Sequence, residues 1–342
     1  MKRSIIFSQA PAKIVAVLNC YEHELSEGRE ITIVVRTNLK GLYQFYKELG
    51  LKANIQMIED RGSSGLYFWK NKKQNKELAC LLGLNRIDDV RIFFTDIYDF
   101  GMGVLMPILI PFNPIHILSP VDVTDGENYE ERQRGLPFIN KCKGIIYSYL
   151  YKISLCYIYG EGGWMLVMDN RKLKFSKIDY SDRKICVRYK KKISVNSGRY
   201  AIFFTEPYRF SYQSKEEYNA MNRQIINEIH QAGYKIAVKG HPRIGCQEDA
   251  EQMADEVLAN YIPSEYIDFS AYEFAVGFTS TSLCEVANDI KAYSVFKMCT
   301  VTDERVYLDF MKYMERNGSK VKLIKSYSEM FECTVSWARR CV

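Results

Sequence analysis

The sequence predicts an α/β protein with two Rossmann-like domains, each built around a parallel sheet. Short apolar segments rich in Ile, Val and Phe alternate with amphipathic segments of helical length from the first residues to about Tyr151. The pattern becomes irregular between Ile153 and Lys190 and restarts at Tyr200. The two series of alternation predict domains at residues 1–195 and 196–342.

In the first half, strands and helices are expected in strict alternation. Ser8 and Gln9 follow the first apolar segment, and Pro11 then favours the first turn of a helix because its fixed φ suits that position. β-branched and aromatic runs predict strands at 4–7, 30–36, 54–58, 90–94 and 115–121. Helical spacing of apolar residues predicts helices at 11–24, 39–49, 69–82 and 128–151.

The second half repeats this alternation after a turn-rich stretch near Ser197 and Gly198. Apolar runs predict strands at 200–204, 234–238, 274–276, 292–297 and 321–324. Amphipathic spacing predicts helices at 215–232, 248–260, 282–289, 304–316 and 326–339. No internal repeat divides the chain further.

Composition bounds the class of protein. Of the 342 residues, 47% are hydrophobic and 26% charged, which is ordinary for a globular protein. No window approaches the roughly 20 apolar residues of a membrane span, and the first residues read as a strand rather than a signal peptide. The net charge of +6 suits anionic small molecules or a phospholipid surface and is too diffuse for a nucleic-acid partner. Ten scattered cysteines without a Cys-x-x-Cys pair favour reduced, buried thiols, as in Cys156, Cys186 and Cys284, and a cytoplasmic protein.

A histidine flanked by cations follows the strand expected at 234–238, in the segment Lys239-Gly240-His241-Pro242-Arg243. His241 could donate to a phosphate or protonate a leaving oxygen near neutral pH. Lys239 and Arg243 would hold the negative charge. The alternative is a loop histidine beside two solvated cations.

Hydroxyl groups follow the strand expected at 274–276, in Thr279-Ser280-Thr281-Ser282. Hydroxyls and the free N–H groups of a helix start can converge on a phosphate. The alternative is an ordinary N-cap. Together with the His241 loop, this turn predicts adjacent strand ends that face one ligand.

The His-Pro pair followed by a Ser/Thr pair resembles the bacterial sialyltransferases and polysialyltransferases that act on lipooligosaccharide and capsule. The resemblance implies a GT-B fold, with an acceptor domain and a CMP-sugar donor domain facing a cleft. It implies that His241 and the Ser/Thr pair contact the CMP phosphate, and that an acid after a Pro, here Glu265, binds the ribose. Ser8-Gln9 look like the entry into the acceptor domain, and Thr205-Glu206-Pro207 look like the usual first turn of the donor domain.

The third mark of these enzymes is an acid-acid-Gly motif that supplies the general base. The candidate here is Asp125, followed by Gly126, although Thr124 stands where the first acid is usual. A turn or a helix cap is the alternative for Asp125. The competing acids, ranked lower, are Asp60, Asp122 and Glu161.

The resemblance implies an inverting glycosyltransferase that moves sialic acid or a related nonulosonic acid from a CMP-sugar to a surface-glycan acceptor. The acceptor is expected to be a galactoside of lipooligosaccharide, O-antigen or capsule, deprotonated by Asp125 as it attacks. No metal or other cofactor is expected, because CMP leaves with a single phosphate and no DxD motif follows a strand end.

Two alternatives stay open. A poly(glycerol phosphate)-type enzyme would transfer a phosphoryl group from a CDP-alcohol, but it needs a second catalytic histidine, and His116 lies inside an expected strand. A catalytically silent nucleotide-sugar-binding subunit is favoured by Thr124 alone. Peripheral membrane association through residues 70–76 or 188–192 is also left open, and the sequence does not fix the oligomeric state.

Overall fold

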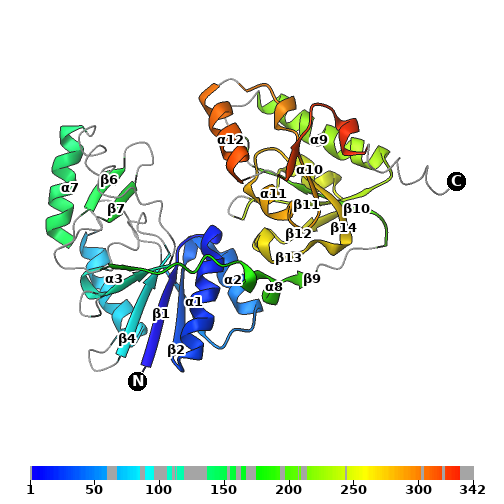
Figure 1. The fold of residues 1–342 in the computed structure, drawn as a ribbon. Helices are drawn as coiled ribbons and strands as arrows, with labels where there is room; N and C mark the ends of the chain where they lie inside the picture. Colours follow the sequence, from blue (N-terminus) through cyan, green and yellow to red (C-terminus); the bar gives the residue numbers. More distant parts are fainter. Residues whose placement is uncertain are drawn as a thin grey trace. The chain divides into compact units, whose positions relative to one another are not determined.

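The computed structural model of the 342-residue chain divides into two compact units, Met1–Arg188 (unit 1) and Tyr189–Val342 (unit 2) (Figure 1). It describes residues 2–59, 68–84, 89–95, 106–109, 112, 114–118, 137–151, 155–158, 163–166, 175–192, 197–206, 208, 214–242, 245–301, 304–317 and 320–331. Each unit contains a six-stranded sheet in which all neighbouring strands are parallel. The predicted α/β class with two Rossmann-like units, as in GT-B enzymes, is confirmed.

Unit 1 has the strand order β3-β2-β1-β4-β5-β8. The strands are β1 (Lys2–Ser8), β2 (Glu30–Arg36), β3 (Asn54–Ile58), β4 (Asp89–Phe94), β5 (Ile115–Ile117) and β8 (Phe175–Lys177). The helices are η1 (Pro11–Lys13), α1 (Ile14–Ser26), η2 (Thr37–Leu39), α2 (Lys40–Glu48), α3 (Phe68–Leu81), α5 (Met106–Leu109), α7 (Phe138–Tyr151) and α8 (Lys184–Tyr189). An antiparallel pair, β6 (Leu155–Ile158) and β7 (Gly163–Leu166), completes the unit.

The central strands of unit 1 are apolar on both faces because both faces are covered. Ile5, Ile6 and Phe7 of β1 are fully buried, and Phe7 stacks on Phe94 of β4 with ring centroids 4.5 Å apart. This continuous apolar pattern is why the first four strands could be predicted within one or two residues.

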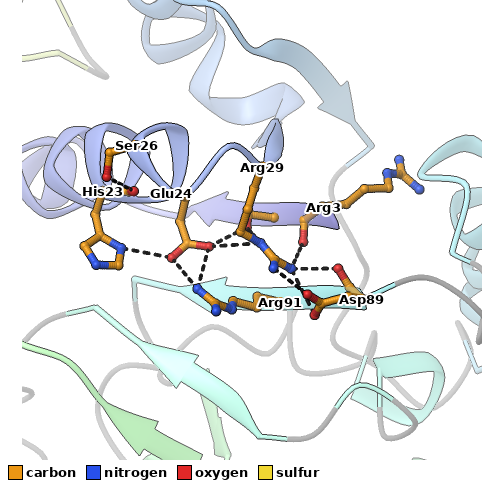
Figure 2. A network of polar contacts seen from close by, with 8 residues as sticks. Arg3, His23, Glu24, Ser26, Arg29, Asp89 and Arg91 are labelled. Carbon is orange, nitrogen blue, oxygen red and sulfur yellow. Dashed lines mark hydrogen bonds and ion pairs between the residues drawn. The ribbon is translucent and has the colours of Figure 1, made fainter. Parts of the chain in front are cut away.

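A buried ionic network joins the amino ends of β1, β2 and β4 to helix α1 (Figure 2). The Glu24 carboxylate accepts a hydrogen bond from Ser4 Oγ at 2.5 Å and lies 3.3 Å from Arg29 Nε and 3.2 Å from Arg91 Nη1. Arg29 also donates to Asp89 Oδ2 at 2.7 Å, and this bond holds the pKa of Asp89 below its usual range. The network therefore closes the edge of the sheet opposite to the carboxyl ends of the strands.

Unit 2 has the strand order β12-β11-β10-β14-β15-β16. The strands are β10 (Tyr200–Phe204), β11 (Lys235–Lys239), β12 (Glu256–Leu258), β14 (Tyr272–Gly277), β15 (Lys291–Ser294) and β16 (Val321–Leu323). The helices are α9 (Lys215–Gln231), α10 (Glu248–Met253), η5 (Ser264–Tyr266), η6 (Phe269–Ala271), α11 (Thr281–Val286), η7 (Phe296–Met298), α12 (Glu304–Asn317) and η8 (Tyr327–Met330). The strands β9 (Lys191–Lys192) and β13 (Ile267–Asp268) form a separate, two-stranded parallel sheet.

The core of unit 2 packs aromatic side chains between the sheet and α9. Tyr218 of α9 lies 4.9 Å from Phe278, and Phe278 lies 6.3 Å from Phe203 of β10, measured between ring centroids. A capping box made by Ser214 and Glu217 fixes the start of α9. These aromatic contacts therefore pack the carboxyl ends of β10 and β14 against α9.

Three expectations about the elements differ from the structure. The strand expected at 292–297 ends at Ser294, and Phe296–Met298 form η7. The helix expected at 248–260 is wrong: α10 ends at Met253, and Glu256–Leu258 form β12, which pairs with β11. The Asp255 carboxylate accepts a hydrogen bond from Ile236 N at 2.8 Å, so pairing with β11 overrides the helical pattern. The helix expected at 326–339 is described only as η8, and its later residues lie outside the described part of the chain.

The expected domain boundary at 195/196 falls on residues 193–196, outside the described residues. The structure divides the chain after Arg188, because β9 pairs with β13 of unit 2. Within the described residues, no helix is long and apolar enough to cross a membrane. Seven cysteines in the described part of the chain are free thiols, of which Cys20 and Cys186 are buried and Cys284 is half-buried.

Candidate functional site

The carboxyl ends of β11, β10 and β14 carry the polar segments of unit 2. From β10 the chain proceeds to β11 on one side, while β14 lies on the other side and leads outward to β15. The ends of β10 and β14 therefore flank the switch point where open α/β sheets bind ligands. The expectation that the His241 loop and the Ser/Thr turn follow adjacent strands is wrong, because β10 lies between β11 and β14 and adds Thr205 and Glu206 between the two loops.

The His-Pro loop is pinned by backbone contacts. His241 N donates to Gly245 O at 3.0 Å, and Gly245 N donates to His241 O at 2.8 Å. Gly240 N donates to Asn260 Oδ1 at 2.9 Å. A Cβ at Gly240 would lie 2.3 Å from Cys246 N, so only glycine allows this close approach. The loop thus holds His241 half-buried and Pro242 exposed at the strand end.

Lys239 is more deeply buried than its expected role in binding a phosphate suggests. Lys239 is only 3% exposed, and its Nζ donates a hydrogen bond to Asn260 O at 3.3 Å. Burial lowers the pKa of Lys239 to about 8, and the nearby Cys246 and Glu265 partly oppose this shift. Such a lysine carries a charge that an incoming anion could stabilise, which makes it a site candidate.

Glu206 ties the end of β10 to the turn after β14. Its buried carboxylate accepts hydrogen bonds from Thr279 N and from Thr279 Oγ1, each at 2.5 Å. The Glu206 carbonyl accepts from Tyr218 Oη at 2.7 Å and from Gln247 Nε2 at 3.0 Å. The backbone N–H and the hydroxyl of Thr279 therefore both donate to Glu206. The expected contact of Thr279 with a phosphate stays a prediction.

The Ser/Thr turn begins a short helix and contacts the segment that bears Glu265. Ser280 caps α11 by accepting from Ser282 N at 3.3 Å. Ser264 Oγ lies 3.0 Å from Ser282 Oγ and 3.3 Å from Glu265 Oε2, within hydrogen-bonding distance of both. Thr281, the first residue of α11, is exposed. The structure thus brings the expected ribose-binding residue next to the expected phosphate-binding turn.

The residues expected at the acceptor side lie at the carboxyl end of β1 in unit 1. Ser8 and Gln9 are both buried. Ser8 Oγ hydrogen-bonds Tyr46 Oη at 2.9 Å, and Gln9 N donates to Thr95 Oγ1 at 3.0 Å. Ser8 thus joins the end of β1 to α2, and Gln9 joins it to the residue after β4. The contact of Ser8 and Gln9 with an acceptor stays a prediction.

Three expected site residues, Asp125, Gly126 and Arg243, lie outside the described residues. Among the residues that the structure describes, no cluster of three or more His, Cys, Asp or Glu could hold a metal ion. His116 lies within β5 and stacks on Phe93 with centroids 4.9 Å apart, and burial lowers its pKa. This position in the sheet disfavours His116 as the second catalytic histidine of a phosphoryl transferase.

Two organising residues escaped the sequence analysis. Asn260 accepts from Gly240 N and Lys239 Nζ and lies 3.5 Å from Cys246 Sγ, so it orders the His-Pro loop. It follows β12, which was expected to be helix. Glu206 was noted as part of a turn, and a carboxylate directly after an apolar strand was the available signal for its buried role.

Comparison with known proteins finds a family model that matches the part of the chain carrying these motifs. Residues 143–298 match the family model described as alpha-2,8-polysialyltransferase (POLYST). The matched span contains His241, Glu265 and the Ser280–Ser282 turn, so the predicted resemblance to bacterial sialyltransferases and polysialyltransferases is confirmed. No match to a curated protein sequence was found.

Solved structures similar to this chain include glycosyltransferases, each of low sequence identity. A sialyltransferase from Photobacterium damsela is 13% identical, with 94% of this chain and 81% of that chain covered and a TM-score of 0.45. The E. coli ADP-heptose lps heptosyltransferase II is 12% identical, with 95% and 90% covered and a TM-score of 0.42. The glycotransferase of kitacinnamycin is 9% identical, with 94% and 86% covered and a TM-score of 0.48. The family match supports a glycosyltransferase.

Proposed function

We propose that this chain, whose residues 143–298 match the polysialyltransferase family, is an inverting sialyltransferase. It moves sialic acid or a related nonulosonic acid from a CMP-sugar to a surface-glycan acceptor. The acceptor is a galactoside of lipooligosaccharide, O-antigen or capsule. The reaction takes place in the cytoplasm, a compartment that suits the free thiols of the described cysteines.

The observation that carries the proposal is that the His-Pro loop and the Ser/Thr turn lie at the same carboxyl edge of the sheet in unit 2. Asn260 fixes Gly240 of the His-Pro loop, and the segment that follows Asn260 contacts Ser282 through Ser264. Glu206 joins the same turn to β10 through Thr279. Residues far apart in the sequence are therefore linked by hydrogen bonds at the switch point of unit 2, where a nucleotide would bind.

Each expected residue has a role that fits a CMP leaving group. His241 stabilises or protonates the phosphate as it departs, and Ser280, Thr281 and Ser282 supply hydroxyl and N–H donors. Glu265 accepts hydrogen bonds from the ribose hydroxyls. Asp125 deprotonates the acceptor hydroxyl. Fixed donors suffice for one phosphate, so the reaction is expected to proceed fully in EDTA.

A transfer assay with CMP-sialic acid and a panel of galactosides tests the proposal. His241→Ala is expected to lose at least about 100-fold in turnover, the usual contribution of a general acid or base, while its melting curve stays that of the wild type. The control is His230→Gln, because His230 pairs with Asp255 at the opposite edge of the sheet. Equal activity in the wild type and His241→Ala, or no transfer to any acceptor, would overturn the proposed function.

A further inference from the structure

Helix α7 of unit 1 exposes its apolar side. Five of its large apolar residues are strongly exposed: Phe138 82%, Ile139 62%, Ile145 71%, Ile146 55% and Tyr149 85%. Gly144, in contrast, is buried. A helix in a water-soluble protein normally buries its apolar stripe, so the exposure of these residues on α7 is unusual.

The exposed apolar residues form one continuous face. At about 100° per residue, Ile145, Phe138, Tyr149, Ile146 and Ile139 cover an arc of roughly 120° in that order. Lys141 lies about 40° beyond one end of this arc, and Lys143 lies about 40° beyond the other. Gly144 falls on the opposite side of the helix, which is the side turned toward the protein.

This arrangement indicates a lipid surface as the occupant of the face. Contiguous exposed apolar patches mark interaction sites, and an apolar face with lysines at its borders matches a helix lying in a membrane interface, where lysine stems extend to the headgroups. The 14 residues of α7 include no Asp or Glu, so its charge complements anionic headgroups. The helix is too short to span a bilayer, which needs about 20 apolar residues.

We propose that α7 docks unit 1 on an anionic membrane surface, with Phe138, Ile145 and Ile146 inserted among the lipid chains. The docking does not depend on the transferase reaction proposed above, and it is measured without turnover. If both hold, the acceptor of this enzyme is a membrane-anchored glycan, because α7 belongs to the unit expected to bind the acceptor.

Vesicle co-sedimentation of the full chain tests the proposal. The vesicles consist of phosphatidylcholine with or without phosphatidylglycerol, at low and high salt. The double variant Phe138→Ser/Ile146→Ser removes apolar contact, and Lys143→Gln removes one border charge. The matched control Val187→Ser/Leu308→Ser changes two apolar residues that are exposed on α8 and α12.

The wild type and the control are expected to bind the anionic vesicles equally. The Phe138→Ser/Ile146→Ser variant is expected to bind at least tenfold more weakly, and Lys143→Gln about fivefold more weakly at low salt. Unchanged binding by the double variant, or no binding by the wild type, would overturn the proposal. So would sedimentation equilibrium showing a dimer that only the double variant dissociates, because a second copy would then cover the face.

Discussion

Lys239 is a buried charged residue at the candidate site, and its pKa depends on whether an anion is bound there. Its ammonium group is almost fully buried at the end of β11 and donates to the carbonyl of Asn260. Burial disfavours the charged form, and the lowered pKa of about 8 records this cost. A phosphate bound nearby would favour the charged form and raise the pKa again.

We therefore predict a pH dependence that Lys239→Met removes. The lysine has a lower pKa in the folded than in the unfolded state, so the unfolded chain binds more protons between about pH 8 and 10.5, and stability rises through this window. The rise should reach about 3 kcal/mol relative to Lys239→Met, measured by hydrogen exchange of β11 amides across this pH range. A parallel pH profile in both proteins would contradict the burial of a charged Lys239.

Both units have a hydrogen bond between the residues that follow the two strands at the switch point of the sheet. In unit 1 a residue after β1, Gln9, hydrogen-bonds Thr95 after β4. In unit 2 a residue after β10, Glu206, hydrogen-bonds Thr279 after β14. Because the chain leaves the two paired strands toward opposite sides at this point, a hydrogen bond between the residues that follow them fixes the spacing of the two loops.

The bridge in unit 2 predicts coupled losses of stability. Glu206→Gln places an amide N–H group against a donor, and Thr279→Val removes one donor from a buried carboxylate. Each should cost about 2 kcal/mol, and the double variant should cost about 1 kcal/mol less than the sum. Hydrogen exchange of β10 and β14 amides measures these values. Glu273→Gln, a change at an exposed ion pair with Arg199, is the control, and additive losses would refute the bridge.

The network around Glu24 serves the opposite edge of the sheet in unit 1 (Figure 2). Glu24 and Arg29 have side chains only 2% and 1% exposed. Glu24→Ala leaves the buried Arg29 without this partner, so we expect unit 1 to lose about 3 kcal/mol of stability. Hydrogen exchange of β1 amides measures the loss, and Glu27→Ala, at the exposed end of α1, should change it by less than about 0.5 kcal/mol. A loss of similar size in both variants would contradict the network.

At the scale of the whole molecule, the features that could be predicted from the sequence are the strands and the polar segments that directly follow them. The strands of both units read as apolar runs because helices cover both faces of each sheet. The loop at His241 and the turn at Ser280 were found because each directly follows such a strand. Strand order is set by pairing between distant segments, so neither β12 nor the place of β10 between the two motifs could be predicted. Asn260 was missed for the same reason.

The central claim is that unit 2 binds CMP through the His241 loop, and calorimetric titration with CMP, CDP and UDP tests it most directly. The wild type should prefer CMP, and His241→Ala should bind it at least about tenfold more weakly, as expected when a charge-assisted hydrogen bond is lost. His230→Gln should bind CMP as the wild type does. Preference for UDP, or equal CMP affinity in His241→Ala, would contradict the account.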